Sequence, residues 1–263
     1  MPDLQISRDL RNIPISKVGV KDISYPIVVM DKNRSIQHTV ARVNMYVDLP
    51  HHFKGTHMSR FIEILDAYRE DIALNNMETI LQRMKEKLGA SRAHLEIAFP
   101  YFIEKRAPVS GARSLMEYTC TFTGSLDTTY DFILGVKVPV NSLCPCSKEI
   151  SSYGAHNQRS IVTAQVRYSD FIWIEDLIEI IEQCGSSPVY SLLKRADEKF
   201  ITEYAYDHPM FVEDMVREAT IRLSALDNIT WFSVEAENFE SIHKHSAYAS
   251  VEQKCARANQ TED

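Results

Sequence analysis

The chain has 263 residues, of which 44% are hydrophobic and 25% charged, and its formal net charge is −7. This composition is that of a globular protein with a sizeable core, and its acidity argues against general binding of nucleic-acid backbones. No apolar run approaches the roughly 20 residues of a membrane span, and a polar N-terminus with five cysteines indicates a cytoplasmic protein without membrane partners.

The first half of the chain predicts a ββααββ unit. Residues 1–22 are expected to form an extended arm, and β-branched residues then predict strands. Apolar residues at spacings of four, three and four predict a helix, and a second helix is expected to end at Gly89. The expected strands are 24–31, 37–49, 92–104 and 114–125, and the expected helices are 75–89 and one with Phe61, Leu65, Tyr68 and Ile72 on its face.

The second half predicts the same order of elements. Its first helix is expected to be closed by Gly185, and Pro209 suits the first turn of the second. The expected strands are 129–140, 159–169, 229–238 and 244–252, with Val162, Ala164, Val166 and Tyr168 sharing a face; the helix faces are Ile174, Leu177, Ile178 and Ile181, then Val212, Met215, Val216, Ala219 and Leu223.

This repeated order of elements predicts an α+β fold of two modules, each with an antiparallel sheet and paired helices on one face. The bare sheet face of each module must then be covered, either by oligomerisation or by curling into a barrel. The expected divisions are an arm at 1–22, modules at 23–126 and 127–254, and a tail at 255–263.

Two cysteines stand one residue apart where a predicted strand ends. Cys144 and Cys146 follow an apolar run, and His156 comes twelve residues after the first of them. A thiolate and an imidazole suit zinc or a related divalent ion, although this spacing is not a standard zinc pattern. The alternative is a buried small hydrophobic residue with an unrelated loop histidine, which Pro145 and its polar neighbours disfavour. By contrast, Cys120 and Cys184 are expected in the core.

A histidine pair near the C-terminus predicts acid–base chemistry. On a strand after Ile242, His243 and His245 would share a face with an apolar, buried row, with Glu240 in the preceding turn. Burial would then tune the pKa of the pair for proton transfer. The alternative is a solvated strand end with incidental histidines.

Other charged residues are less distinctive. Glu213 lies at the border of an apolar helix stripe, where a carboxylate can simply favour the helix N-terminus. Glu198 has charged neighbours that suggest a solvated helix. Lys54, His57 and Arg60 surround Gly55 at a strand-to-helix junction, which suits a phosphate without forming a complete phosphate-binding motif.

Five stretches resemble the GTP cyclohydrolase IB family. They are VPVNSLCPCSKEISSYGAHNQRS, DLRNIPISKVGVKDISYPI, KGTHMSRF, MFVEDMVRE and AENFESIHKHSAYA, and together they extend the resemblance over nearly the whole chain. The resemblance implies a tunnelling fold whose homo-oligomers, expected to be tetramers, surround a barrel-like tunnel. It implies hydrolysis of GTP to 7,8-dihydroneopterin triphosphate and formate, the first step of tetrahydrofolate synthesis, with a divalent metal ion such as zinc, manganese or iron.

The resemblance also implies roles for individual residues. Cys144, His156 and Glu198 would be the metal ligands, which for Glu198 differs from the reading of its neighbours alone. Glu213 would anchor the purine, because a carboxylate accepts paired, charge-assisted N–H bonds from guanine. Catalysis would fall to Cys144, His243 and Glu240, with His245 and Cys146 close to the substrate; Lys148 and Arg159 join the candidate cations for the triphosphate.

Two other functions remain open at this point. An NADPH-dependent nitrile reductase of the same superfamily would use a cysteine as a covalent nucleophile without a metal, but its lysine-rich cofactor motif is not evident. A non-enzymatic module could instead use Cys144 and His156 in a structural metal site that assists oligomer assembly. In that case His243 and His245 would have no purpose.

Overall fold

The computed structural model describes residues 5, 7–68 and 76–255. It is an α+β structure built on a large sheet, in which the strands hydrogen-bond in the order β1-β2-β3-β4-β5-β6-β8-β9, with β7 paired to β5. The chain divides into two compact units, the first formed by Met1–Pro100 with Thr121–Leu134 and the second by Tyr101–Cys120 with Gly135–Asp263. The divisions between the two units fall within strands.

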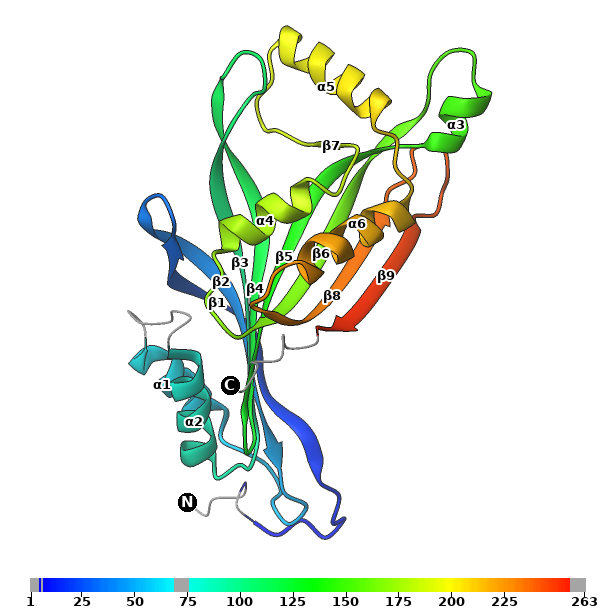
Figure 1. Cartoon of the computed structure of the whole chain (residues 1–263). Helices are drawn as coiled ribbons and strands as arrows, with labels where there is room; N and C mark the ends of the chain where they lie inside the picture. The colour runs from blue at the N-terminus through cyan, green and yellow to red at the C-terminus, as the bar shows by residue number, and fades with distance from the viewer. Residues whose placement is uncertain (1–4, 6, 69–75, 256–263) are drawn as a thin grey trace, which may run out of the picture. The chain divides into compact units, whose positions relative to one another are not determined.

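The first half of the chain has the predicted ββααββ order. Its helices α1 and α2 contact each other and lie against β1 and β2 (Figure 1). The elements are β1 Ile15–Asp31, β2 Ser35–Leu49, α1 Met58–Ala67, α2 Met77–Leu88, β3 Ala93–Arg106 and β4 Arg113–Leu126.

Two details of this half differ from the prediction. β1 begins at Ile15, inside the predicted arm, because it pairs with the far end of β2, where Ile15 lies opposite Leu49. Helix α1 ends at Ala67, so Tyr68 is its C-cap, and Ile72 of the predicted helix lies outside the described residues. Gly89 does close α2, with a φ of 63° in the left-handed region that favours glycine.

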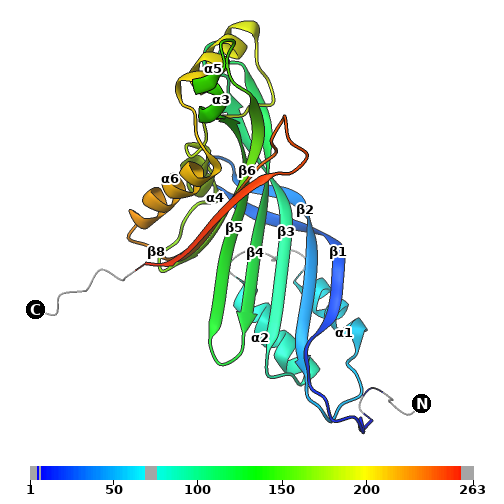
Figure 2. The same cartoon turned by 90° about the vertical axis from the view of Figure 1, so that its right-hand side faces the viewer.

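The second half repeats the order and adds three segments. Figure 2 shows α4 and α6 on one face of the strands of this unit, and α6 contacts β8 and β9. The elements are β5 Tyr130–Leu143, α3 Pro145–Ile150, β6 Asn157–Tyr168, α4 Ile174–Glu182, β7 Ser187–Pro188, α5 Arg195–Asp207, α6 Val212–Ser224, β8 Ile229–Asn238 and β9 Ala247–Lys254. The additions are α3, β7 and α5.

The core of the second unit follows the predicted periodicities. Alternate residues of β6 point to the helix-covered face, and the apolar stripe of α6 packs onto it, because side chains repeat every two residues in a strand and about every 3.6 in a helix. The buried residues of β6 include Val162, Ala164 and Val166, and those of α6 are Val212, Met215, Val216, Ala219 and Leu223, as predicted.

A polar cluster fixes α4 to β3 and β4. The Glu182 carboxylate accepts hydrogen bonds from Lys105 Nζ at 2.6 Å and from the Tyr118 hydroxyl at 2.5 Å. Seven residues earlier on the same helix, Glu175 accepts a hydrogen bond from the Tyr101 hydroxyl at 2.6 Å. Burial, followed by the nearby Glu182 charge, raises the pKa of Tyr118. These bonds satisfy polar groups that would be costly to bury alone.

Three predictions for the second half were wrong in detail. Helix α4 ends at Glu182 and is capped by Gln183, whereas Gly185 serves a close approach, since a Cβ there would meet Val140 Cβ at 2.6 Å. Pro209 precedes α6, whose N-cap is Phe211. Strand β9 begins at Ala247, three residues later than expected, because its pairing with β8 starts opposite Asn238. No helix of the described chain is long and apolar enough to cross a membrane.

Candidate functional site

Cys144 stands at the junction between β5 and α3. It is the N-cap of α3, and its Sγ accepts a hydrogen bond from the Ser147 N–H at 3.4 Å. Pro145 occupies the first turn of the helix, where its missing N–H costs nothing. Cys144 is half-buried and Cys146 is exposed, so neither thiol is the buried small hydrophobic residue that the alternative interpretation required.

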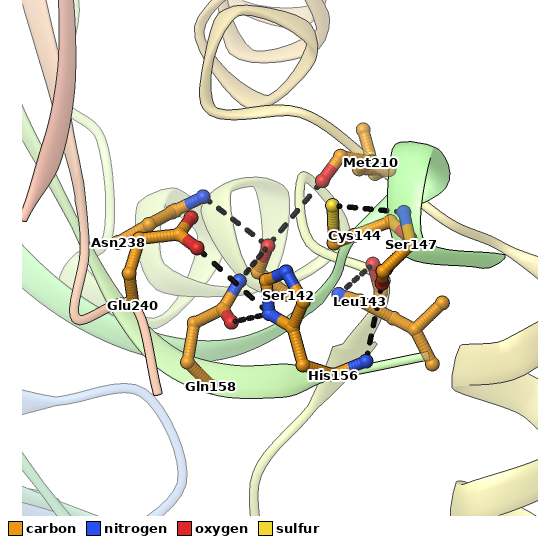
Figure 3. A network of polar contacts seen from close by, with 10 residues as sticks. Ser142, Leu143, Cys144, Ser147, His156, Gln158, Met210, Asn238 and Glu240 are labelled. Carbon is orange, nitrogen blue, oxygen red and sulfur yellow. Dashed lines mark hydrogen bonds and ion pairs between the residues drawn. The ribbon is translucent and has the colours of Figure 1, made fainter. Parts of the chain in front are cut away.

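His156 lies directly beside Cys144. The backbone N–H of Cys144 donates to the His156 carbonyl at 3.1 Å. The imidazole Nδ1 is 2.9 Å from Gln158 Oε1 and 3.8 Å from Glu240 Oε2, and dashed lines mark both contacts in Figure 3. The His156 and Glu240 side chains are only 13% and 16% exposed. The structure therefore places the Cys144 backbone beside His156 and brings a carboxylate from a distant segment close to the His156 imidazole.

A buried polar network lies next to His156 and contacts it through Gln158. Ser142 Oγ accepts from Gln158 Nε2 at 3.1 Å and from Asn238 Nδ2 at 3.2 Å, and it donates to the Met210 carbonyl at 3.3 Å (Figure 3). Sequence motifs alone did not point to these three side chains. The sequence did contain a hint of the network. Gln158 is in the same alternating register as Val162, Ala164 and Val166, which places a polar side chain on the buried face, where it needs hydrogen-bond partners.

The start of α6 is tied to the end of β5. The Met210 N–H donates to the Leu143 carbonyl at 3.1 Å, next to Cys144. Three residues further on, Glu213 is exposed in the first turn of α6, while Asp214 accepts from the Phe211 N–H at 3.1 Å and caps the helix. Since Asp214 performs the capping, Glu213 is available for another partner.

His243 and His245 do not lie where the sequence predicted. Both are exposed and belong to the loop before β9, so they do not share a buried strand face with Ala247. Their rings are stacked with centroids 5.0 Å apart. The His243 N–H donates to the Glu240 carbonyl at 3.3 Å, which connects this loop to the residue beside His156.

Glu198 is not gathered with Cys144 and His156. It is exposed on α5, next to the buried Asp197. Among the described residues, no three His, Cys, Asp or Glu side chains lie close enough together to hold a metal ion. The Cys144 thiol and the His156 imidazole thus suit a metal in kind, but the three ligands implied by the resemblance are not gathered in one place among the described residues.

The candidate cations for a triphosphate lie in both units. In the second unit, Lys148 Nζ donates to the Tyr206 carbonyl and lies 4.2 Å from the centroid of the Tyr206 ring, and Arg159 is exposed. In the first unit, Arg60 donates to the Lys87 carbonyl at 3.1 Å, near the start of α1. These contacts do not single out one phosphate ligand.

The two cysteines of the core have thiols of low reactivity. Cys120 and Cys184 are buried, as predicted. Burial raises the pKa of the Cys184 thiol to about 12 and raises that of Cys120 as well. Since the thiolate is the nucleophile and the metal ligand, the reactive thiols of the described chain are to be sought at Cys144 and Cys146.

Comparison with solved structures shows the fold. Uricase from Arthrobacter globiformis superposes with a TM-score of 0.52 at 9% identity, covering 94% of this chain and 96% of that one. Urate oxidase from Bacillus sp. TB-90 gives a TM-score of 0.53 at 10% identity, covering 91% and 99%. At such low identity the likeness concerns the architecture and carries no activity with it.

Comparison with known sequences shows the family. The profile of a family described as type I GTP cyclohydrolase folE2 matches residues 1–249. The GTP cyclohydrolase FolE2 of Geobacter sulfurreducens is 79% identical over 258 residues, covering 98% of this chain and all of that protein. The FolE2 proteins of Citrifermentans bemidjiense and Syntrophus aciditrophicus are 78% and 60% identical over 96% and 97% of this chain, covering 94% and 100% of their own. The chain belongs to the FolE2 family of type I GTP cyclohydrolases.

Proposed function

We propose that this chain hydrolyses GTP to 7,8-dihydroneopterin triphosphate and formate, the first step towards tetrahydrofolate. Family membership over nearly the whole chain supports the activity. The observations that support this site are the backbone hydrogen bond between Cys144 and His156 and the Glu240 carboxylate 3.8 Å from the His156 imidazole. A nitrile reductase is disfavoured, since the relatives reported above are named as cyclohydrolases.

Cys144 and His156 are the residues that we propose to hold a divalent metal ion, zinc, manganese or iron, with Glu198 as the third ligand. When bound, such an ion supplies a Lewis acid that makes water a better nucleophile at neutral pH. Because Glu198 is exposed on α5, its role needs a separate test: Glu198→Gln should lower metal content without lowering the free energy of unfolding.

Glu213 is proposed to anchor guanine. Its carboxylate can accept two N–H bonds from the N1 and exocyclic amine edge of the base, and both bonds are charge-assisted. Its place on a capped helix whose start is tied to Leu143 gives it a fixed distance from the junction that holds Cys144. The base would thereby be oriented with its imidazole ring towards the site.

Proton transfers are assigned to the exposed histidine loop. We expect His243 to donate a proton to N7 of guanine, which makes C8 more electrophilic, so that water adds to C8 and the ring opens. His245 is stacked on His243 with ring centroids 5.0 Å apart, which is close enough for it to orient His243 or to return a proton to it. A second water then releases C8 as formate. The ribose opens, its carbonyl shifts along the chain, and condensation of that carbonyl with the freed amine closes the pterin ring and releases one water. Glu240 stands between this loop and His156.

Assembly into homo-oligomers, with a tetramer expected, is part of the same proposal. The face of the second unit opposite α4 and α6 carries a cavity of about 440 Å³ whose lining includes Glu117, Lys137, Glu235 and Glu237. A bare sheet face in a protein of this fold needs cover or solvent-compatible side chains, and these charged groups are compatible with a wet tunnel lining.

The test is a turnover assay on protein stripped with a chelator and supplied with GTP, with or without Mn²⁺ or Zn²⁺. Formate and the fluorescent oxidised pterin are measured together, with Cys144→Ala as the inactive control. We expect both products to appear only with metal. No formate under any metal would refute the proposed reaction, and NADPH oxidation by a nitrile substrate would then be measured in its place.

A further inference from the structure

Three strands of the second unit end in buried polar side chains instead of apolar ones. Ser142 on β5, Gln158 on β6 and Asn238 on β8 are 1%, 7% and 2% exposed. Each continues the register of the apolar core residues of its strand. Buried polar groups are expensive unless their hydrogen bonds are complete, so their arrangement beside His156 calls for a reason.

The Ser142 hydroxyl fixes the direction of the network. A hydroxyl has one proton to donate and two lone pairs that accept. The Met210 carbonyl can only accept, so the proton of Ser142 is committed to it at 3.3 Å. Both lone pairs of Ser142 must therefore receive N–H groups, and they receive them from Gln158 Nε2 at 3.1 Å and Asn238 Nδ2 at 3.2 Å.

This commitment orients the Gln158 amide. With its NH₂ group on Ser142, its oxygen faces His156 Nδ1 at 2.9 Å. An amide oxygen accepts and cannot donate, so Nδ1 of His156 must carry a proton. The Glu240 carboxylate, 3.8 Å from the same nitrogen, is also an acceptor and favours the same state. Two independent neighbours thus place the proton of the neutral ring on Nδ1.

We propose that Gln158 is a positioning residue, which together with Ser142 and Asn238 holds His156 in the Nδ1–H tautomer and leaves the Nε2 lone pair free. That lone pair is what a metal ion or a proton must bind, and outer partners of this kind orient a histidine and set its tautomer. The metal-binding consequence rests on the proposed function, whereas the tautomer itself does not.

The tautomer can be measured directly on the wild-type protein without metal. The protein is labelled with ¹⁵N-histidine, and two-bond ¹H–¹⁵N correlations, which tell the two ring nitrogens apart, are recorded at about pH 8.5. The His156 signals are identified by their loss in His156→Asn. We expect Nδ1 to be the protonated nitrogen. Protonation on Nε2, or rapid averaging of both forms, would overturn the proposal.

Substitutions at Gln158 test the positioning role. Gln158→Met keeps the length but neither hydrogen bond, while Gln158→Glu keeps an acceptor for Nδ1. We expect Gln158→Met to weaken Zn²⁺ binding, measured by chelator competition, by about 10–100-fold, and to lower kcat more than it changes KM for GTP. Gln158→Glu should recover most of the Zn²⁺ affinity.

Gln165→Met is the matched control, since Gln165 lies on β6 in the opposite register, away from Ser142. It should bind Zn²⁺ as the wild type does. Unchanged Zn²⁺ affinity in Gln158→Met, or an equal loss in Gln158→Met and Gln158→Glu, would contradict the positioning role. A wild-type protein that binds no Zn²⁺ would refute the proposed metal site, and the NMR measurement would still decide the tautomer.

Discussion

The two halves of the chain share one order of elements but differ in what is added to it. The first half consists of β1–β4 with α1 and α2, and the second repeats this order and adds α3, β7 and α5. The unusual side chains are in or beside the additions: Cys144 and Cys146 at α3, His156 after it, and Glu198 on α5. The repeated elements supply the core, and the added segments supply candidate chemistry, as is common for loops on a rigid scaffold.

The end of β2 and the strand ends around the candidate site differ at the level of single residues. In the first half, the buried register of β2 stays apolar to its last residue, from Ala41 through Met45 to Leu49. In the second half, the buried registers finish on Ser142, Gln158 and Asn238. Each of these side chains is hydrogen-bonded to another member of the network, which offsets part of the cost of burial and orients the side chain beside it, although Asn238 Oδ1 is buried without a partner.

The largest expected effect comes from removing the thiol at the added helix. Cys144→Ala should lower turnover by on the order of 10⁴-fold, as for other essential active-site groups, and should remove bound metal. The midpoint of urea unfolding should barely change, because Cys144 is half-buried and outside the core. Cys255→Ala is the control and should retain activity and metal. Retained turnover in metal-free Cys144→Ala would contradict the claim that the added segments supply the catalytic groups.

Matched leucines in the shared framework test the other side of the comparison. Leu81 on α2 and Leu177 on α4 are both fully buried. Either Leu→Ala change should lower the free energy of unfolding by about 3–5 kcal/mol, the cost of lost burial plus a cavity, while kcat of the folded protein stays near the wild-type value. Ile221→Ala on the exposed side of α6 should cost less than about 0.5 kcal/mol. A large loss of kcat in the folded Leu177→Ala protein would show that framework and site are not separable.

Glu213→Gln tests a site residue placed on a repeated helix instead of an added one. Losing a charge-assisted hydrogen-bond partner should raise KM for GTP by about 30–150-fold, which corresponds to about 2–3 kcal/mol. Glu203→Gln on the exposed surface of α5 is the control and should leave KM unchanged. If KM and kcat were both unaltered in Glu213→Gln, Glu213 would be removed from the proposed site.

The smallest effect is expected at the start of α5 and depends on pH. Burial raises the pKa of Asp197, but hydrogen bonds from Ser110, Lys194 and Val109 outweigh it and hold the pKa below its ordinary value. A carboxyl group whose pKa is lower in the folded state than in the unfolded state stabilises the fold at pH values above its unfolded pKa, near 4. This stabilisation is lost as the pH falls below that value towards the folded pKa. The difference in unfolding midpoint between wild type and Asp197→Asn should therefore shrink between about pH 5 and pH 2. Asp207→Asn, at the exposed end of α5, should show no such trend; a constant difference for Asp197→Asn would contradict the assignment.

Local patterns were sufficient for most of the framework. The alternation of Val162, Ala164 and Val166 and the stripe around Met215 on α6 predicted a strand and a helix face that the structure confirms. Such periods are fixed by backbone geometry within a few residues, so they can be read without knowing the partner of a segment. Motif resemblance supplied the family in the same way, because it depends on residue identity alone.

Long-range pairing decided what local patterns could not. Whether His243 and His245 stood on a strand depended on where β9 meets β8, and the pairing begins only at Ala247. Gly185 serves a close contact with Val140, which its neighbours in the chain do not reveal.

The sequence by itself determined the order of the repeated elements, most of the apolar faces, the family and the chemical types of Cys144 and His156. Only the tertiary structure placed Glu240 beside His156 and joined Asn238 to Ser142, 96 residues away in the chain. The reason is physical: periodicity and residue type are local properties, whereas the direction of a hydrogen bond depends on which distant groups the folded strands bring within about 3 Å of each other.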